Sequence, residues 1–347
     1  MLDYSDVFAL EPFALGAQDK NRLYGAWLDR LGAHHRHFCA PYARLCATLG
    51  NRPALPVRLF KYVDLRSVAS HDVARTMTSS GTSGQQVSRI YLDKDTSARQ
   101  SKALTRIVSS FIGKKRLPLL IIDSSAVFKD RAMFSARGAG IRGFSLLGRD
   151  TCYALDADMK VDMAAVLAFA KKYRGQPTLL FGFTFMIWQH FYLALRQADV
   201  KLDLQGFLIH GGGWKKLTNI AVSNSDFKQA LSAQTGITHV FDYYGMVEQT
   251  GSIFMECEQG HLHASVFSDV DILDPLTLEP GATGRGCICT TSLLPTSYPG
   301  HILLTEDEGE ILGQDTCPCG RLGKYFKVYG RMPGAEIRGC SDTYVAG

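Results

Sequence analysis

Hydrophobic positions near the start of the chain follow a helical period. Leu23, Trp27 and Leu31 recur at helical spacing. Pro41 is placed to open a second helix, and Gly50 is placed to end it. A further helix is predicted from Asp95, which can cap its N-terminus, because apolar side chains recur through Leu104, Ile107, Val108 and Phe111.

The middle of the chain alternates between short apolar runs and helical patterns. Strands are predicted at 117–123, 178–183, 206–210 and 238–245, and helices at 161–173 and 185–195. This alternation is typical of an α/β domain with mostly parallel strands. In such sheets, ligands bind beyond the carboxyl ends of the strands, so glycine-rich turns at those ends indicate candidate sites.

The pattern changes again near residue 264 to short β runs. These are predicted at 265–273, 286–291, 301–305, 309–313 and 324–330. We therefore expect an α/β core with N-terminal helices over 1–263, a smaller β-rich subdomain over 264–332 and a short mobile tail over 333–347.

Composition narrows the class of protein. The 347 residues are 46% hydrophobic and 20% charged, which is typical of a globular protein. The net charge of +5 is dispersed, which argues against nucleic-acid binding, and no apolar run is long enough to span a membrane. The acidic N-terminus is unlike a secretion signal, and nine cysteines fit a reducing compartment, so we expect a cytoplasmic protein.

Three motifs carry the candidate chemistry, and each has a plainer alternative. A loop of glycines and hydroxyl side chains is either a flexible linker or a phosphate-binding loop; it contains Thr78, Ser79, Ser80, Gly81, Thr82, Ser83 and Gly84. Gly211, Gly212 and Gly213 follow a predicted strand and form either a tight turn or a surface for a flat ligand. Glu248, after Tyr244-Gly245, is either a surface charge or a ligand of Mg²⁺.

Taken together, these motifs resemble those of the adenylate-forming superfamily. Within it, the chain is similar to the acyl-protein synthetases of bacterial luminescence, also called long-chain-fatty-acid–luciferin-component ligases. The stretches that carry this resemblance are Pro56–Lys61, Ser88–Asp93, His210–Leu217 and Arg338–Thr343. Phenylacetate–CoA ligases look like the next relatives, through Glu256–Glu258 and Cys317–Arg321. The expected fold is that of the N-terminal domain of adenylate-forming enzymes.

The resemblance implies that ATP and a carboxylic acid give acyl-AMP and pyrophosphate, after which the acyl group passes to a thiol. By motif, Gly211–Gly213 would contact adenine and Tyr244 would stack on it or line the pocket. Asp307 would take the ribose hydroxyls, Arg331 would approach the nucleotide, and Glu248 would hold Mg²⁺.

Two departures from the superfamily pattern affect this expectation. The loop lacks the usual lysine, since Gln86-Val87-Ser88 follows it, and Val247 stands where a threonine is usual. The usual large C-terminal domain with its catalytic lysine is also expected to be absent, because the chain stops at Gly347. Lys215 and Lys216 are candidates for a substitute cation, and His210 joins them as a candidate catalytic residue.

Cys340 lies in the tail sequence RGCSDTY. In the luminescence family, a cysteine in this position accepts the acyl group as a thioester before a reductase subunit takes it. Arg338 would favour the reactive thiolate. The alternative is a bystander cysteine.

Other cysteines suggest a structural metal. Cys257 with His261 or His263, followed by Cys317 and Cys319, offers ligands at a spacing suited to tetrahedral zinc. Against this, Cys-x-Cys is less common than Cys-x-x-Cys at such sites. A second histidine group, which contains His34, His35 and His37, is expected to be solvated.

The leading interpretation is an ATP-dependent acyl-protein synthetase that loads Cys340 and serves an acyl-reductase or carrier protein. An acyl- or aryl-CoA ligase is the alternative within enzymes, and a catalytically silent nucleotide-binding scaffold is the alternative outside them. The acid is not readable from the sequence, because the pocket candidates Phe183, Phe185 and Trp188 are equally suited to a core. The chain is also a candidate homo-oligomer.

Overall fold

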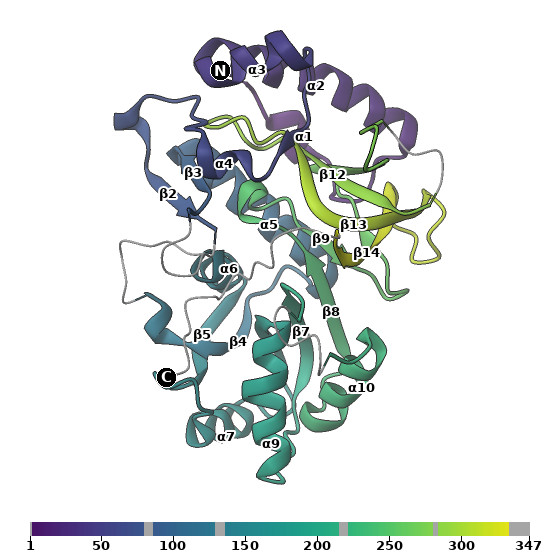
Figure 1. Cartoon of the computed structure of the whole chain (residues 1–347). Coiled ribbons are helices and arrows are strands. Elements are labelled where there is room, and N and C mark those ends of the chain that lie inside the picture. The colour runs from purple at the N-terminus through teal and green to yellow at the C-terminus, as the bar shows by residue number, and fades with distance from the viewer. Residues whose placement is uncertain (1, 80–85, 129–135, 215–220, 280–283, 333–347) are drawn as a thin grey trace. The chain divides into compact units, whose positions relative to one another are not determined.

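The computed structural model describes residues 2–79, 86–128, 136–214, 221–279 and 284–332, which fall into two compact units. The first unit combines residues of Met1–Ile107 and Gly245–Ile337, and the second contains Val108–Tyr244. Figure 1 labels the elements of both. No helix among the described residues is both long enough and apolar enough to cross a membrane.

The second unit is built on a parallel sheet. Four of its strands agree with the predicted ones, and the strand at 148–155 was not predicted. In spatial order the strands are β5 (Gly148–Leu155), β4 (Leu117–Ser124), β6 (Pro177–Phe183), β7 (Gln205–Gly211) and β8 (His239–Tyr244). Every neighbouring pair is parallel. The chain leaves β4 toward β5 on one side and continues to β6 on the other, which makes the β4–β6 edge a topological switch point.

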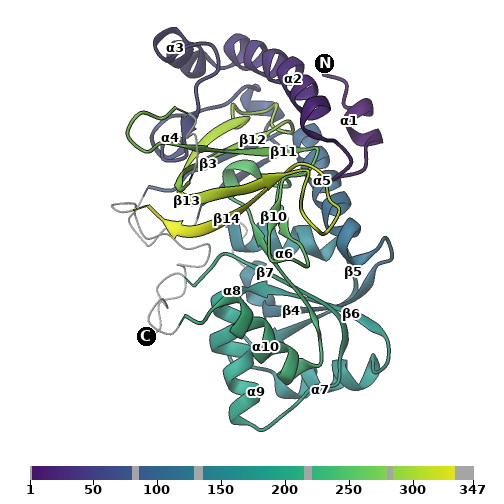
Figure 2. The same ribbon diagram turned by 90° about the vertical axis from the view of Figure 1, so that its right-hand side faces the viewer.

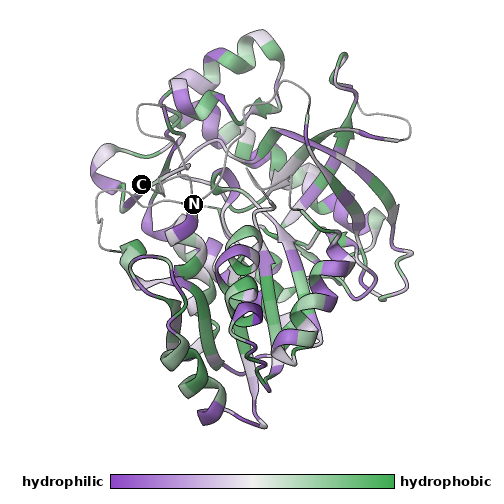
Figure 3. Cartoon of the chain, turned by 60° about the horizontal axis from the view of Figure 1, so that its bottom comes forward, coloured by the Kyte–Doolittle hydropathy of each residue, from purple (hydrophilic) through white to green (hydrophobic). Residues whose placement is uncertain are grey.

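Helices cover both faces of this parallel sheet, so its strands read as continuous apolar runs (Figure 3). One face packs on α7 (Met163–Lys172), the helix formed by α8, η3 and α9 (Thr184–Gln197) and α10 (Asn224–Thr235). The predicted helix at 185–195 is therefore present, but Ile187–Tyr192 is a π-helical segment within it. On the other face, Phe144 of α6 (Ala136–Ser145) stacks on Phe181 at 4.0 Å between ring centroids.

The first unit contains a set of antiparallel strands. Those from residue 268 onward lie in the predicted β-rich region, whereas the two short strands at 254–256 and 262–263 were not predicted. The strands are β9 (Phe254–Glu256), β10 (Leu262–His263), β11 (Ser268–Leu273), β12 (Gly286–Ser292), β13 (Ile302–Gln314) and β14 (Lys324–Arg331). The prediction of separate strands at 301–305 and 309–313 is wrong, because both belong to β13. A β-bulge at Glu308/Gly309 lets the strand continue through its acidic middle. Figure 2 shows β13 and β14 as two neighbouring strands.

Helices and a hairpin complete the first unit. They are α1 (Ser5–Ala9), α2 (Ala17–Phe38), α3 (Ala40–Leu49), α4 (Leu59–Tyr62), η1 (Ser70–Asp72), β2 (Arg75–Thr78) and β3 (Arg89–Leu92), while β1 (Leu55–Pro56) pairs with β13. Pro41 and Gly50 open and end α3 as predicted. Asp95 does not cap α5 (Lys94–Ile112); the carboxylate of Asp93 accepts from the backbone N–H of Thr96 at 2.7 Å and caps it instead.

His35 corrects the expectation of a solvated histidine group. Its side chain is fully buried, with Nδ1 2.8 Å from the Ser67 hydroxyl and the ring stacked 4.9 Å from His301. Burial holds the pKa of His35 well below its usual value. The helical pattern marks a polar stretch but does not show which of its members packs against a distant segment.

Candidate functional site

The glycine- and hydroxyl-rich loop is closed at its base by a two-stranded hairpin. Thr78 of β2 lies opposite Arg89 of β3, and beyond them the Ser79 hydroxyl accepts from the backbone N–H of Ser88 at 3.0 Å. Ser79 N–H donates back to the Ser88 carbonyl at 3.2 Å. The loop ends are therefore fixed side by side, which an extended linker does not require. Ser80, Gly81, Thr82, Ser83 and Gly84 lie outside the described residues.

The glycine turn after β7 depends on its glycines. Gly212 and Gly213 have φ angles of +81° and +63°, which side-chain-bearing residues rarely adopt. A Cβ on Gly211 would lie 2.6 Å from the ring of Tyr243 and 2.7 Å from its carbonyl oxygen. The turn and the end of β8 thus pack at backbone distance, and Tyr244 at the end of β8 is half-buried beside them.

His210 sits in a polar group at the carboxyl ends of β6, β7 and β8. Its Nδ1 lies 3.0 Å from the Thr184 hydroxyl, which donates to the Gly211 carbonyl, and 3.5 Å from the Asp242 carboxylate. Since both contacts use Nδ1, the ring cannot pass a proton from one partner to the other. Burial, aided by the charge of Lys228, lowers the pKa of His210 to about 3. The ring therefore stays neutral and braces the glycine turn.

The candidate pocket aromatics separate into two groups within the second unit. Phe183 and Phe185 pack with Leu155, Met159 and Met186. Trp188 instead packs with the α10 side of the core, where its ring stacks 5.7 Å from Phe227 and meets Trp214 at 5.5 Å.

Asp307 and Arg331, both candidate nucleotide-binding residues, face each other across β13 and β14. Arg331 Nε lies 3.3 Å from the Asp307 carboxylate, and its NH1 lies 3.1 Å from Glu306. Arg58 pairs with the other oxygen of Glu306. The two acids and two arginines form one network, so the Asp307 carboxylate is oriented before any ligand arrives.

Glu248 is buried, with 6% of its surface exposed, in the 3-10 turn Val247–Gln249. A surface charge is thus excluded for this residue. The turn is held by Tyr298, whose hydroxyl donates to the Glu248 carbonyl at 2.8 Å.

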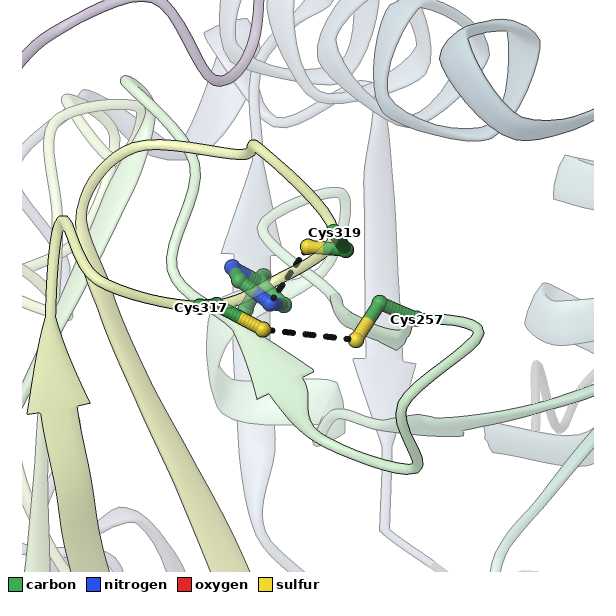
Figure 4. Close-up of side chains that lie close together, drawn as sticks. Cys257, Cys317 and Cys319 are labelled. Atoms are coloured by element: carbon green, nitrogen blue, oxygen red, sulfur yellow. Dashed lines mark hydrogen bonds between the residues drawn. The ribbon is translucent and has the colours of Figure 1, made fainter.

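Cys257, His263, Cys317 and Cys319 form a compact cluster in the first unit. One ligand atom from each lies within 4.8 Å of all the others. Cys257 follows β9, His263 ends β10, and the other two lie in the connection between β13 and β14. Figure 4 shows the three thiols pointing toward one another. Of the two candidate histidines, it is His263 that completes the group.

The separations within the cluster match a tetrahedral metal site. Cys257 Sγ and Cys317 Sγ are 3.9 Å apart, and Cys319 Sγ is 3.4 Å from His263 Nε2. Metal–ligand bonds of about 2.3 Å to sulfur and 2.0 Å to nitrogen give tetrahedron edges of about 3.8 Å and 3.5 Å. Burial raises the pKa of the Cys257 thiol to about 12 and lowers that of His263 to about 4. Burial thus favours protonated Cys257 when no metal is bound.

Two further contacts hold the connection that carries Cys317 and Cys319. Arg321 forms a bidentate pair with Glu258, at 2.6 and 3.2 Å, beside Cys257. Asp315 accepts from the backbone N–H of Gly323 and of Ala17, the first residue of α2, at 2.7 and 2.8 Å. The connection that carries Cys317 and Cys319 is therefore held on both sides of these two residues.

Two buried ion networks were missed from the sequence. At the β4 end, Asp123 pairs bidentately with Arg137, and both are buried. In the first unit, fully buried Lys20 lies 3.3 Å from Asp269, which also pairs with Lys324 at 3.0 Å. For Asp123, the only sequence signal was its position as the acid that ends the apolar run LPLLIID. No sequence signal indicated that Lys20 is buried.

Cys340, Lys215 and Lys216 lie outside the described residues, so their predicted roles rest on the sequence alone.

Comparisons with known proteins identify the family to which the chain belongs. A family model described as acyl-protein synthetase, LuxE, matches residues 3–346. The long-chain-fatty-acid–luciferin-component ligase of Aliivibrio fischeri is 25% identical over 315 residues, covering 85% of this chain and 78% of that protein. The ligase of the same name from Vibrio harveyi is 22% identical over 363 residues, covering 96% and 90%.

Solved structures share the fold. 2-Hydroxyisobutyryl-CoA ligase, in an open conformation with 2-HIB-AMP and CoA, aligns with a TM-score of 0.71 and 15% identity over 96% of this chain and 80% of its own. ATP-bound MatB from Rhodopseudomonas palustris aligns with a TM-score of 0.51 and 18% identity over 76% and 49%. The predicted adenylate-forming fold is confirmed, and the chain belongs to the acyl-protein synthetase (LuxE) family of ligases.

Proposed function

We propose that this enzyme activates a fatty acid with ATP as acyl-AMP and transfers the acyl group to its own Cys340, from which a protein partner such as an acyl reductase or carrier takes it. The observation that carries the proposal is the set of three motifs in superfamily order: a pinned hairpin loop, a glycine turn after β7 and a buried acid in the turn after β8. In each step, positioning and charge neutralisation supply the catalysis.

The first step joins an oxygen of the substrate carboxylate to the α-phosphorus of ATP and breaks the α–β phosphoanhydride bond, releasing pyrophosphate. Backbone N–H groups and hydroxyls of Thr78–Gly84 would donate to the phosphates, and Lys215 and Lys216 would replace the missing loop lysine. Mg²⁺ would neutralise phosphate charge when bound, with Glu248 as its carboxylate ligand. In the second step the Cys340 thiolate attacks the acyl carbonyl, and AMP leaves.

Nucleotide recognition would use the glycine turn after β7, Tyr244 and Asp307. Gly211–Gly213 and Tyr244 offer a backbone surface and an aromatic ring for adenine. Asp307, oriented by Arg331, offers a carboxylate to accept hydrogen bonds from the ribose hydroxyls. The ion pair with Arg331 would keep the Asp307 carboxylate in one orientation for these hydrogen bonds.

The names of the relatives support the substrate class and the chemistry. Both curated relatives are long-chain-fatty-acid ligases, and the 2-hydroxyisobutyryl-CoA ligase was crystallised with an acyl-AMP and a thiol. The eight cysteines among the described residues are free thiols, which fits a reducing cytoplasm.

Exchange of labelled pyrophosphate into ATP tests the proposal. We expect exchange to depend on a carboxylic acid, to be fastest with long acyl chains and to need no CoA. A panel of acids of increasing length, each measured with and without CoA, distinguishes the proposed function from its two alternatives. Formation of acyl-CoA at a rate that outruns protein labelling would favour the CoA-ligase alternative, and absence of exchange with every acid would favour a binding scaffold.

The cluster of Cys257, His263, Cys317 and Cys319 would hold a structural Zn²⁺. Four protein ligands at tetrahedral separations leave no open position for substrate, as in structural rather than catalytic zinc sites. Plasma mass spectrometry of the purified full chain should find about one zinc per chain. A chain that binds no zinc, even after incubation with zinc under reducing conditions, would disprove the site.

A further inference from the structure

A buried chain of hydrogen bonds ends on the turn that carries Glu248. Gln100 of α5 donates from Nε2 to the Tyr298 hydroxyl at 3.2 Å, and that hydroxyl donates to the Glu248 carbonyl at 2.8 Å. Tyr298 is fully buried and Gln100 is 3% exposed. Since burial raises the pKa of Tyr298, its hydroxyl remains a donor.

Tyr298 is itself fixed by its neighbours. The preceding Ser297 donates from its hydroxyl to the Tyr91 carbonyl at 2.8 Å and accepts at its own carbonyl from the backbone N–H of Ser67 at 2.8 Å. The Tyr298 ring also meets Phe60 edge-on at 6.1 Å. These contacts do not involve Glu248, so Tyr298 is a rigid support rather than a side chain that follows the turn.

The remainder of the turn packs against the same support. Gln249 donates from Nε2 to the carbonyls of Gly300 and Thr290, at 2.8 and 3.2 Å. A Cβ on Gly300 would lie 2.2 Å from the Tyr298 ring and 3.0 Å from the Glu248 carbonyl oxygen. The carbonyl of Glu248 and the side chain of Gln249 are therefore both held by segment 297–300.

We propose that Tyr298 is a positioning residue for the Glu248 carboxylate, and through it for the Mg²⁺–ATP complex that this carboxylate would hold. The inference rests on the proposed function. A carboxylate that binds Mg²⁺ has to meet a near-ideal octahedral geometry, so a small rotation of its backbone weakens the contact. Loss of such an outer-shell partner typically costs about 10- to 100-fold in metal affinity or activity.

Tyr298→Phe removes the hydroxyl and keeps the ring, and Tyr24→Phe is its matched control. Tyr24 is also buried and also donates to a backbone carbonyl, that of Val266 at 3.2 Å. In the pyrophosphate-exchange assay, we expect Tyr298→Phe to raise the KM for Mg²⁺–ATP by about tenfold or more and to leave the KM for the acid unchanged. Tyr24→Phe should change neither KM, although both variants should lower Tm.

A double-mutant cycle with Glu248→Gln separates positioning from general stability. If Tyr298 acts through the Glu248 carboxylate, Tyr298→Phe has no further effect on the KM in the Glu248→Gln background. Equal fold-changes in both backgrounds, or the same rise in KM for Tyr24→Phe, would overturn the inference. Should Tyr298→Phe fail to fold, Gln100→Leu, which removes the donor to the Tyr298 hydroxyl, should shift the same KM in the same direction.

Failure of the proposed function can be distinguished from failure of the inference about Tyr298. If the wild-type chain shows no exchange, calorimetric titration of ATP with and without Mg²⁺ replaces the assay. The Mg²⁺-dependent part of ATP affinity should then fall in Tyr298→Phe and not in Tyr24→Phe. An ATP affinity that Mg²⁺ does not change in the wild type would refute both the Glu248 ligand and its positioning residue.

Discussion

Cys317→Ser removes one of three thiol ligands from the cluster and tests whether a metal stabilises the fold. A metal held there would join Cys257 to Cys317, which are 60 residues apart in sequence. Closing a loop of that length restricts the unfolded chain by about 4 kcal/mol in the chain-entropy treatment that applies to disulfides and metal clips. With about 2.1 cal/mol/K of unfolding entropy per residue over 347 residues, this lowers Tm by about 6 °C.

Cys289→Ser is the matched control for this prediction. Cys289 and Cys317 are both 5% exposed, but Cys289 lies in β12 and outside the cluster. Calorimetry and zinc analysis of both variants should show zinc lost and Tm lowered by about 6 °C or more only in Cys317→Ser. Equal losses of Tm in the two variants, or full zinc content in Cys317→Ser, would refute the reasoning.

Three further predictions follow from the geometry. Asp269→Asn leaves the buried Lys20 ammonium without its carboxylate and should cost about 3–5 kcal/mol in urea unfolding at pH 7; a loss below about 1 kcal/mol would argue against a charged Lys20. The folded-state pKa values of His301 and His210 are lowered to about 3, so the unfolded chain binds more protons than the folded chain below pH 6.5. The free energy of unfolding should therefore be highest above pH 6.5 and lower by about 2 kcal/mol per histidine at pH 5. A pH series of unfolding midpoints checks this. Gly211→Ala places a methyl group against the neighbouring strand and should lower kcat/KM for ATP by up to about 100-fold, with unchanged kinetics counting against the adenine assignment.

The parallel strands β4, β6 and β7 were predictable because they are buried on both faces. Each of β4, β6 and β7 reads as a continuous apolar run, and the helices between them have clear apolar stripes. The strand β13 was not predictable as one element. Glu306, Asp307 and Glu308 interrupt its apolar pattern, and only pairing with β14 across a bulge keeps it continuous.

The candidate site was predictable where its chemistry is local in sequence. The spacing of the glycines at strand ends and of the Cys-x-Cys thiols indicates candidate binding sites from the sequence alone. The supports of the site were not predictable, because they depend on which segments meet in three dimensions. Tyr298 reaches Glu248 over 50 residues, and Lys20 reaches Asp269 from a helix near the N-terminus. The choice of His263 over His261 likewise required the structure.

Transfer of a labelled fatty acid to the chain itself tests the central claim most directly. The full-length protein is incubated with ATP, Mg²⁺ and the acid, and intact mass and peptide mapping locate the acyl group. We expect one hydroxylamine-sensitive acyl group on Cys340, none in Cys340→Ser, and undiminished pyrophosphate exchange in that variant. Equal labelling of wild type and Cys340→Ser, or labelling that does not require ATP, would contradict the account.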